Sequence, residues 1–243
     1  MSQGGVRSWA GEAACSLALT AAGLWFAAVA RRMTLFEDGV PGPGLTPMIL
    51  GIALAALGIS IAAGVIRRRA GQRIVVLGED VHQLGGGTNG ATKGLAKRFG
   101  PERVIGTPIS ENAFFGFAGG AALDGRIRPV VEFMYPDFMW VAADQVFNQV
   151  GKARHMFGNN NTLPLVLRTK VAMGSGYGSQ HLMDPAGIFA TAPGWRIVAP
   201  STAADYVGLM NAALALDDPV LVIEHLDLYQ RMDRVPAGDL DYI

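Results

Sequence analysis

Two long stretches without a charged side chain occupy the first 66 residues, and they limit what this chain can fold into. Residues 13–30 and 45–66 contain no Asp, Glu, Lys or Arg, and three consecutive arginines follow the second stretch. A helix that crosses a bilayer needs about 20 predominantly apolar residues in a row. We therefore predict a membrane-type helical region over residues 1–71, with spans at about 13–30 and 45–66.

Other interpretations of these stretches stay open. The first stretch also fits a signal-peptide core, because small apolar residues follow a charged start. Alternatively, both stretches are buried core helices. The arginines at 67–69 favour the cytoplasmic side for that end, so two spans would leave both chain ends in the cytoplasm. We expect a protein of the inner (cytoplasmic) membrane with its later part in the cytoplasm, or a cytoplasmic protein if residues 1–71 do not belong to it.

Charge and cysteine content exclude several classes of protein. The formal net charge is zero, from 20 basic and 20 acidic residues, so no basic field favours nucleic acid. Cys15 is the only cysteine, which excludes an internal disulfide framework. The Cys and His residues show no metal-ligand spacing, so we predict no metal site within this chain.

Beyond residue 72 the pattern changes to short apolar strands that alternate with helical segments. This alternation predicts an α/β fold with a mainly parallel, doubly wound sheet over residues 72–234, followed by a tail at 235–243. Such sheets bind ligands at the carboxyl ends of their strands. The predicted strands are 73–78, 104–105, 128–133, 163–168, 196–199 and 220–223, and the predicted helices are 89–99, 112–123, 140–154, 185–190 and 202–216.

Glu111 is the strongest candidate for chemistry. It ends the run Thr-Pro-Ile-Ser-Glu at 107–111, where a predicted strand turns into a helix, and three phenylalanines follow it within six residues. An apolar setting disfavours the charged form of a carboxyl group, which suits acid–base work. The alternative is a glutamate that only favours the start of a helix through the helix dipole.

Seven blocks in the second part resemble, in the same order, the pyrimidine-binding domain of the beta subunit of thiamine diphosphate-dependent 2-oxoacid dehydrogenases. Members of this family act on pyruvate, branched-chain 2-oxoacids or acetoin. The resemblance implies a transketolase-type domain. The blocks are LGEDV at 77–81, RFGPERV at 98–104, TPISE at 107–111, RPVVEF at 128–133, DQVFNQ at 144–149, PLVLRT at 164–169 and VAPST at 198–202.

The resemblance also implies roles for four residues. Glu111 would hydrogen-bond N1′ of the cofactor's aminopyrimidine, Phe138 would stack on that ring, and Met134 would lie beside it. His181 would assist proton transfer, although the family continues His-Ser-Gln and this chain continues His-Leu-Met. The alternatives are core packing for Phe138 and Met134, and a loop histidine without a task for His181.

Partners follow from what the chain lacks. No Gly-Asp-Gly precedes the asparagines at 159–161, so the resemblance implies an alpha subunit that holds the diphosphate and its magnesium. It further implies an alpha–beta hetero-oligomer, an acyltransferase component of a multienzyme complex, and no activity for this chain alone. Family members also carry a C-terminal domain, and they usually have an acidic residue where this chain has Leu216.

A second resemblance concerns residues 31–69. The run Pro-Gly-Pro-Gly-Leu-Thr-Pro at 41–47 and the apolar helix after it resemble part of the small membrane subunit of tripartite tricarboxylate transporters. Three functions therefore stay open. The first is a beta-type dehydrogenase subunit. The second is a membrane transport accessory with a non-catalytic soluble domain, and the third is a transferase similar to transketolase or deoxyxylulose-phosphate synthase.

Overall fold

The computed structural model describes the backbone of residues 3–69, 73–83, 85–159 and 161–238. The chain divides into two compact units, residues 1–71 and 72–243. The domain boundary expected at 71–72 and the last five residues of the expected tail lie outside the described residues.

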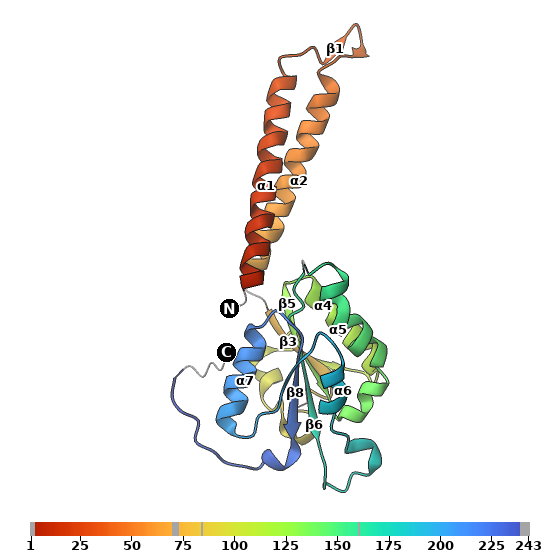
Figure 1. The fold of residues 1–243 in the computed structure, drawn as a ribbon, viewed down its shortest axis with the longest axis vertical. Helices are drawn as coiled ribbons and strands as arrows, with labels where there is room; N and C mark the ends of the chain where they lie inside the picture. The colour runs from red at the N-terminus through yellow and green to blue at the C-terminus, as the bar shows by residue number, and fades with distance from the viewer. Residues whose placement is uncertain (1–2, 70–72, 84, 160, 239–243) are drawn as a thin grey trace. The chain divides into compact units, whose positions relative to one another are not determined.

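The first unit is a pair of antiparallel helices, α1 (Gln3–Ala30) and α2 (Leu45–Arg69) (Figure 1). A short hairpin of β1 (Phe36–Glu37) and β2 (Val40–Pro41) lies in the connection between them. Within these helices, Ala13–Ala30 and Leu45–Ala63 are long and apolar enough to cross a membrane, judged by length and composition alone. Only 17% of each segment is buried, which is too little for the core helices of a soluble protein.

The second unit contains a six-stranded sheet in the order β4-β3-β5-β6-β8-β7, and every neighbouring pair is parallel. Helical segments connect the strands, as parallel pairing requires. The parallel, doubly wound fold predicted from the sequence is confirmed. The strands are β3 (Arg73–Glu79), β4 (Val104–Thr107), β5 (Ile127–Phe133), β6 (Val166–Val171), β7 (Arg196–Val198) and β8 (Val220–His225).

Two hydrophobic layers cover the two faces of this sheet. The larger layer packs Phe115, Phe133 and Leu167 beneath α4 (Glu111–Leu123), α5 (Gly151–Met156) and α6 (Ala186–Thr191). The smaller layer includes Val222 and Ala213 and lies under α7 (Ala203–Ala215). Figure 1 shows α7 on the other side of the sheet from α4 and α5. The strands therefore read as apolar runs because both faces are buried.

Two predicted helices are wrong in detail. Only α3 (Leu95–Phe99) forms within 89–99, after the 3-10 turn η1 (Thr88–Gly90), because Gly90 and Gly94 adopt φ values of 76° and 83° that end helical geometry. The segment predicted as one helix at 140–154 consists of η2 (Pro136–Trp140), the π-helical η3 (Asp144–Val150) and α5. The predicted strand at 163–168 is shifted to Val166–Val171.

Candidate functional site at the carboxyl edge of the sheet

Glu111 is the first residue of α4, and it is 7% exposed. Strand β4 ends four residues earlier, so the acid lies where the sheet meets the start of a helix. The ring of Phe114 packs edge-on against Phe133 of β5 at 5.6 Å between centroids, which fixes α4 on the sheet. The buried Thr107 Oγ1, at the end of β4, has no hydrogen-bond partner in the structure.

A second carboxyl group shares this edge. Glu79 ends β3 and pairs in register with Thr107 of β4. Burial raises the pKa of Glu79, and the negative charges of Asp80 and Glu111 raise it further. The carboxyl ends of β3 and β4 therefore carry a second acid at the same edge of the sheet as Glu111.

Four rings gather where β5 and β6 end. His181 lies edge-on to Tyr135 at 4.9 Å and to Phe138 at 5.3 Å between ring centroids. Tyr177 lies 5.7 Å from Tyr135. Burial raises the pKa of Tyr135 to about 12, helped by the charge of Tyr177 and its hydrogen bond, and by the charge of Glu132. The Nδ1 atom of His181 is buried, and among the described residues it has no hydrogen-bond partner.

One hydrogen bond holds the loop of His181 against η2. The amide of Met183 donates to Asp137 Oδ2 at 3.1 Å, which brings two segments 46 residues apart in the chain together. The structure thus places the two predicted residues Phe138 and His181 in contact. Met134 directly follows β5 and is half-buried. Within residues 73–83, 85–159 and 161–238, no hydrogen bond or ion pair joins Glu111 to this ring cluster.

A buried ion cluster lies on the face of the sheet that α7 covers, and the sequence analysis did not predict it. Arg168 of β6 pairs with Glu132 of β5 and with Glu224 of β8, the latter through Nη2 at 2.6 Å. Lys170 is fully buried and donates to Glu132 Oε1 at 2.9 Å. Tyr206 donates to Glu224 Oε1 at 2.9 Å. The available signal was a charged residue inside each of three apolar strands, since such residues are almost never buried unless paired.

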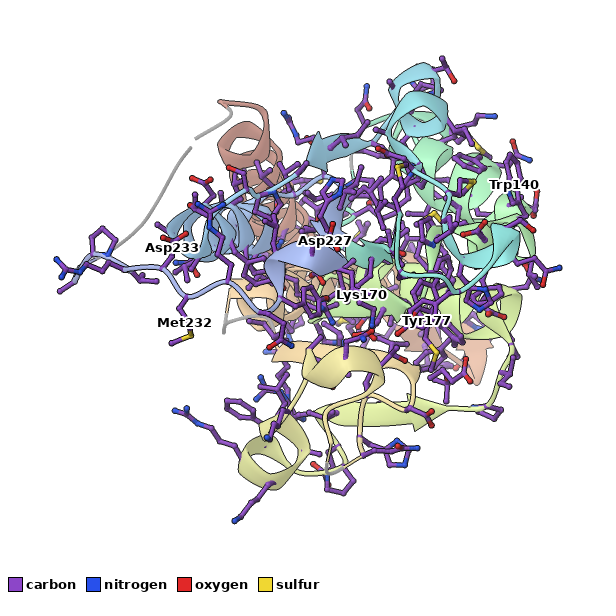
Figure 2. The ribbon with its side chains drawn as sticks, turned by 90° about the horizontal axis from the view of Figure 1, so that it is seen from below. Trp140, Lys170, Tyr177, Asp227, Met232 and Asp233 are labelled. Atoms are coloured by element: carbon purple, nitrogen blue, oxygen red, sulfur yellow. The ribbon has the colours of Figure 1, made fainter. Side chains whose placement is uncertain are left out.

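The pKa values in this cluster follow the balance between burial and pairing. Burial alone would lower the pKa of Arg168, but the charges of Glu224, Tyr206 and Glu132 raise it well above its ordinary value. For Lys170, burial outweighs the attraction of Glu132 and lowers the pKa. Burial would raise the pKa of Glu224, yet Arg168 and three hydrogen bonds lower it. Figure 2 shows Lys170 in the interior, whereas Met232 and Asp233 lie on the C-terminal segment.

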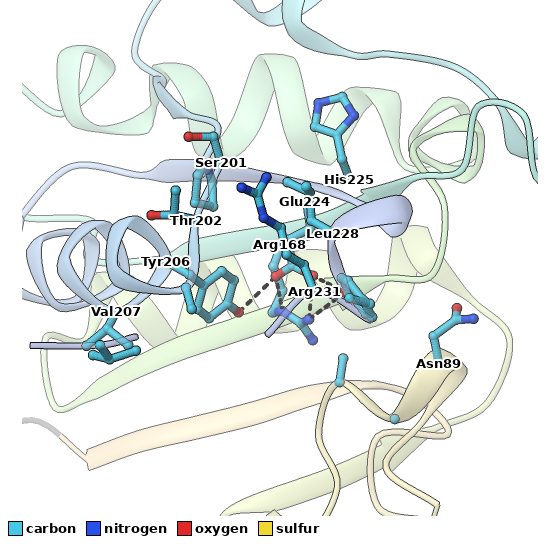
Figure 3. A pocket seen from close by; sticks show the side chains of 16 residues that line it. Asn89, Arg168, Ser201, Thr202, Tyr206, Val207, Glu224, His225, Leu228 and Arg231 are labelled. Atoms are coloured by element: carbon cyan, nitrogen blue, oxygen red, sulfur yellow. Dashed lines mark hydrogen bonds and ion pairs between the residues drawn. The ribbon is translucent and has the colours of Figure 1, made fainter. Parts of the chain in front are cut away.

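A cavity of about 440 Å³ opens onto the ion cluster (Figure 3). Arg168, Glu224 and Tyr206 line it together with Ser201 and Thr202, which precede α7. None of the four predicted site residues lines this cavity. The predicted site residues and this cavity therefore lie in different parts of the α/β unit.

The carboxyl edge suits one end of a thiamine-type cofactor. A buried carboxyl group can hydrogen-bond a ring nitrogen, and the half-buried ring of Phe138 offers a flat face to a heteroaromatic ring. A diphosphate with magnesium needs oxygen ligands instead. Among the described residues, no group of three or more His, Cys, Asp or Glu could hold a metal ion.

The second unit is a parallel six-stranded α/β domain with a buried acid and a ring cluster at the carboxyl ends of its strands. Residues 67–232 match the family described as transketolase, pyrimidine binding domain, and the chain belongs to this family. The match begins at residue 67, and no relative named below supports the predicted likeness of residues 31–69 to a transporter subunit.

The relatives are named as beta subunits. The chain is 40% identical over 174 residues to the acetoin:2,6-dichlorophenolindophenol oxidoreductase subunit beta of Cupriavidus necator, covering 68% of this chain and 51% of that protein. It is 40% identical over 170 residues to the pyruvate dehydrogenase E1 component subunit beta-2, chloroplastic, of Arabidopsis thaliana, covering 70% and 41%. It is 40% identical over 168 residues to the 2-oxoisovalerate dehydrogenase subunit beta of Bacillus subtilis, covering 69% and 51%.

The matches extend over only part of each relative. The chain spans about half the length, or less, of the beta subunits that it matches. A solved structure titled split gene transketolase, inactive beta4 tetramer, has a TM-score of 0.53 and 20% identity, covering 75% of this chain and 55% of that one. This likeness shows the fold alone.

Proposed function

We propose that this chain is the beta-type subunit of a thiamine diphosphate-dependent 2-oxoacid dehydrogenase. It supplies the aminopyrimidine pocket and its activating glutamate for oxidative decarboxylation. The observation that carries the proposal is the buried Glu111 at the carboxyl edge of a pyrimidine-binding domain. Relatives named as beta subunits of acetoin, pyruvate and 2-oxoisovalerate enzymes support the reaction class.

Glu111 is the catalytic carboxyl in this proposal. Bound thiamine diphosphate supplies a thiazolium carbon that becomes a nucleophile when its proton leaves. With the cofactor bound, the Glu111 carboxyl would hold a hydrogen bond to the pyrimidine N1′ and would exchange a proton with that atom. Its 7% exposure keeps water from competing for this bond. The pKa of Glu79 at the same edge is raised, mainly by burial.

The ring cluster positions the pyrimidine and the reacting proton. Phe138 offers a flat face to the pyrimidine, and Met134 packs beside it with a polarizable thioether. His181 is held edge-on by Tyr135 and Phe138, so its imidazole has a fixed orientation. An imidazole has two nitrogens that can donate or accept a hydrogen bond, and the role proposed for His181 is to assist proton transfer on the bound intermediate.

An alpha subunit completes the site. It carries the diphosphate-magnesium motif, and the two subunits form an alpha–beta hetero-oligomer that delivers its product to an acyltransferase component. Large apolar side chains that follow the ends of β4, β5 and β6 support a covered edge. Ile109, Trp140 and Met173 are 75%, 57% and 62% exposed in the isolated chain. Apolar groups gathered around a polar centre are typical of a protein interface.

A dehydrogenase fits the comparisons better than a transferase. The three beta subunits named above are 40% identical to this chain, against 20% for the split gene transketolase, whose likeness extends to fold only.

We propose that the α/β unit lies in the cytoplasm. Residues 1–71 are assigned to the inner membrane, on the strength of two apolar helices that are mostly exposed.

The test is proton exchange at thiazolium C2 in the full chain reconstituted with an alpha partner from a 2-oxoacid dehydrogenase. We expect Glu111→Gln to reduce the exchange rate at least 100-fold, because a carboxamide cannot share its proton with N1′. Glu102→Gln is the matched control, since that side chain is 84% exposed. Exchange that stays at the wild-type rate in Glu111→Gln would remove Glu111 from the assigned role.

A further inference from the structure

The two helices of the first unit approach each other closely along a seam marked by three glycines. A Cβ atom added to Gly23 would lie 2.4 Å from the amide nitrogen of Ala55, and one added to Gly51 would lie 2.7 Å from that of Ala27. A Cβ atom added to Gly58 would lie 2.3 Å from Thr20 Oγ1. No larger residue fits at these three positions, so the backbones touch there.

The polar side chains near the seam are satisfied inside α1. Ser16 is 2% exposed, and its hydroxyl donates to the carbonyl of Ala13 at 2.8 Å. The hydroxyl of Thr20 donates to the carbonyl of Ser16 at 2.8 Å. Neither hydroxyl needs water or another protein, which is the condition for burying polar groups in an apolar medium.

The outer surface of the helix pair is apolar and carries large exposed side chains, unlike the seam of small residues. It presents large apolar side chains and no charged residue between 13 and 30 or between 45 and 63. At about 1.5 Å per residue, spans of 18 and 19 residues reach about 27 and 28 Å, close to the roughly 30 Å of bilayer hydrocarbon. The exposed side chains include Leu17, Leu24, Trp25, Ile49, Ile52, Leu57 and Ile59.

Two features argue against further helices on this outer surface. Glycines allow the closest approach between helices in membranes, and all three glycines of the two spans already lie in the seam, so the outer surface offers Ala and Ser but no glycine among larger apolar side chains. Ion or substrate pathways need ionisable groups within the membrane, and these spans contain none. A transport role for this unit therefore has no chemical support in its side chains.

We propose that residues 13–63 form a self-contained membrane anchor, a two-helix hairpin whose outer surface is covered by lipid acyl chains and not by other helices. Because the helices are antiparallel, both ends of the hairpin emerge on one side of the bilayer. The arginines at 67–69 place that side in the cytoplasm. This inference depends only on the first unit and not on the proposed enzyme function.

The test uses the full chain with Cys15→Ser, Leu17→Cys and Ile59→Cys, labelled with nitroxides and reconstituted into vesicles of phosphatidylethanolamine and phosphatidylglycerol. Leu17 and Ile59 are both exposed, at 70% and 59%. We expect the chain to resist alkaline extraction. We also expect both labels to be fully accessible to oxygen dissolved in the lipid, with a single narrow distance between them in pulsed EPR.

Substitutions in the seam complete the test. Gly58→Leu should broaden the distance between the labels, because a side chain at that position meets Thr20 Oγ1 at 2.3 Å. Ala56→Leu, on the exposed surface, should leave the distance unchanged. The anchor proposal would be overturned if the chain were released from membranes at alkaline pH or were cleaved between α1 and α2. It would also be overturned if the labels were shielded from oxygen, or if the distance between them were unaffected in Gly58→Leu. The proton-exchange assay is independent of these outcomes, so either proposal can fail alone.

Discussion

Replacing Lys170 by Met is expected to lower the free energy of unfolding of the α/β unit by about 3–5 kcal/mol. The Lys170 side chain is fully buried, and its Nζ donates to Glu132 Oε1 at 2.9 Å and to the carbonyl of Thr88 at 3.0 Å. In the wild type the cations of Lys170 and Arg168 balance the carboxylates of Glu132 and Glu224. Methionine leaves one buried carboxylate without a counter-charge, and breaking a buried ion pair on one side costs about 3–5 kcal/mol.

Desolvation acts against this loss but does not cancel it. Burial already lowers the pKa of Lys170, so part of the attraction to Glu132 offsets the cost of burying the ammonium group. Removing both charges should therefore be better tolerated than removing one. The double variant Lys170→Met with Glu132→Gln keeps the Arg168–Glu224 pair. We expect its loss in free energy of unfolding to be smaller, by about 0.5–3 kcal/mol, than the losses of the two single variants added together.

The assay is urea unfolding of the full chain in detergent, followed by tryptophan fluorescence. Arg73→Met is the matched control, because its partner Glu102 lies at 3.7 Å and the two side chains are 63% and 84% exposed. Exposed pairs of this kind contribute about 0–1 kcal/mol. If Lys170→Met were no more destabilising than Arg73→Met, the argument that burial makes this pair indispensable would be wrong.

Two further predictions use the same assay. The pKa of Glu224 is lowered in the folded state, so its stabilising contribution is present above about pH 4.5 and is lost as the pH falls through the folded-state pKa. In Glu224→Gln, the free energy of unfolding should therefore fall less steeply with decreasing pH. An unchanged pH dependence would contradict the pairing with Arg168. Gly194→Ala should lower the free energy of unfolding by about 2–5 kcal/mol. Its φ of 94° is a left-handed conformation that costs alanine about 1–2 kcal/mol. Its Cβ would lie 1.7 Å from the carbonyl oxygen of Gly151, and relieving this clash costs about 1–3 kcal/mol more. Gly187→Ala in α6, with open space around it, should instead raise stability by up to about 1 kcal/mol.

Apolar runs predicted the sheet well because each strand is buried on both faces. The six strands and their parallel pairing were read from short runs of Val, Ile and Leu between helical segments. The helices were less predictable. Positive φ values at Asn89, Gly90 and Gly94 interrupt one of them, and the apolar spacing of 140–154 fits a π-helix as well as an α-helix. Spacing along the chain does not report such local backbone geometry.

Residues of the candidate site could be predicted from the sequence only where they belong to a pattern that resembles a known family. Phe138 and His181 lie 43 positions apart, and their contact depends on the Met183 amide reaching Asp137. The role of Tyr135 as the central ring of the cluster had no sequence signal. The ion cluster had a weak one, since Glu132 and Arg168 are charges within apolar strands, but only the register of β5 against β6 brings them together.

The ion cluster and the ring cluster are carried by the same strands, which links stability to the site. Glu132 pairs in register with Arg168, and Phe138 and His181 follow β5 and β6 at their carboxyl ends. A slip of one residue would turn every side chain to the opposite face. It would break the contacts of Arg168 to two carboxylates, and it would move the rings relative to Glu111. We infer that the buried charges specify strand register, a role that buried ion pairs perform better than they add stability. In that case, the double variant Lys170→Met with Glu132→Gln should lose less stability than the two single losses added together, and it should still bind the cofactor ring less well than the wild type.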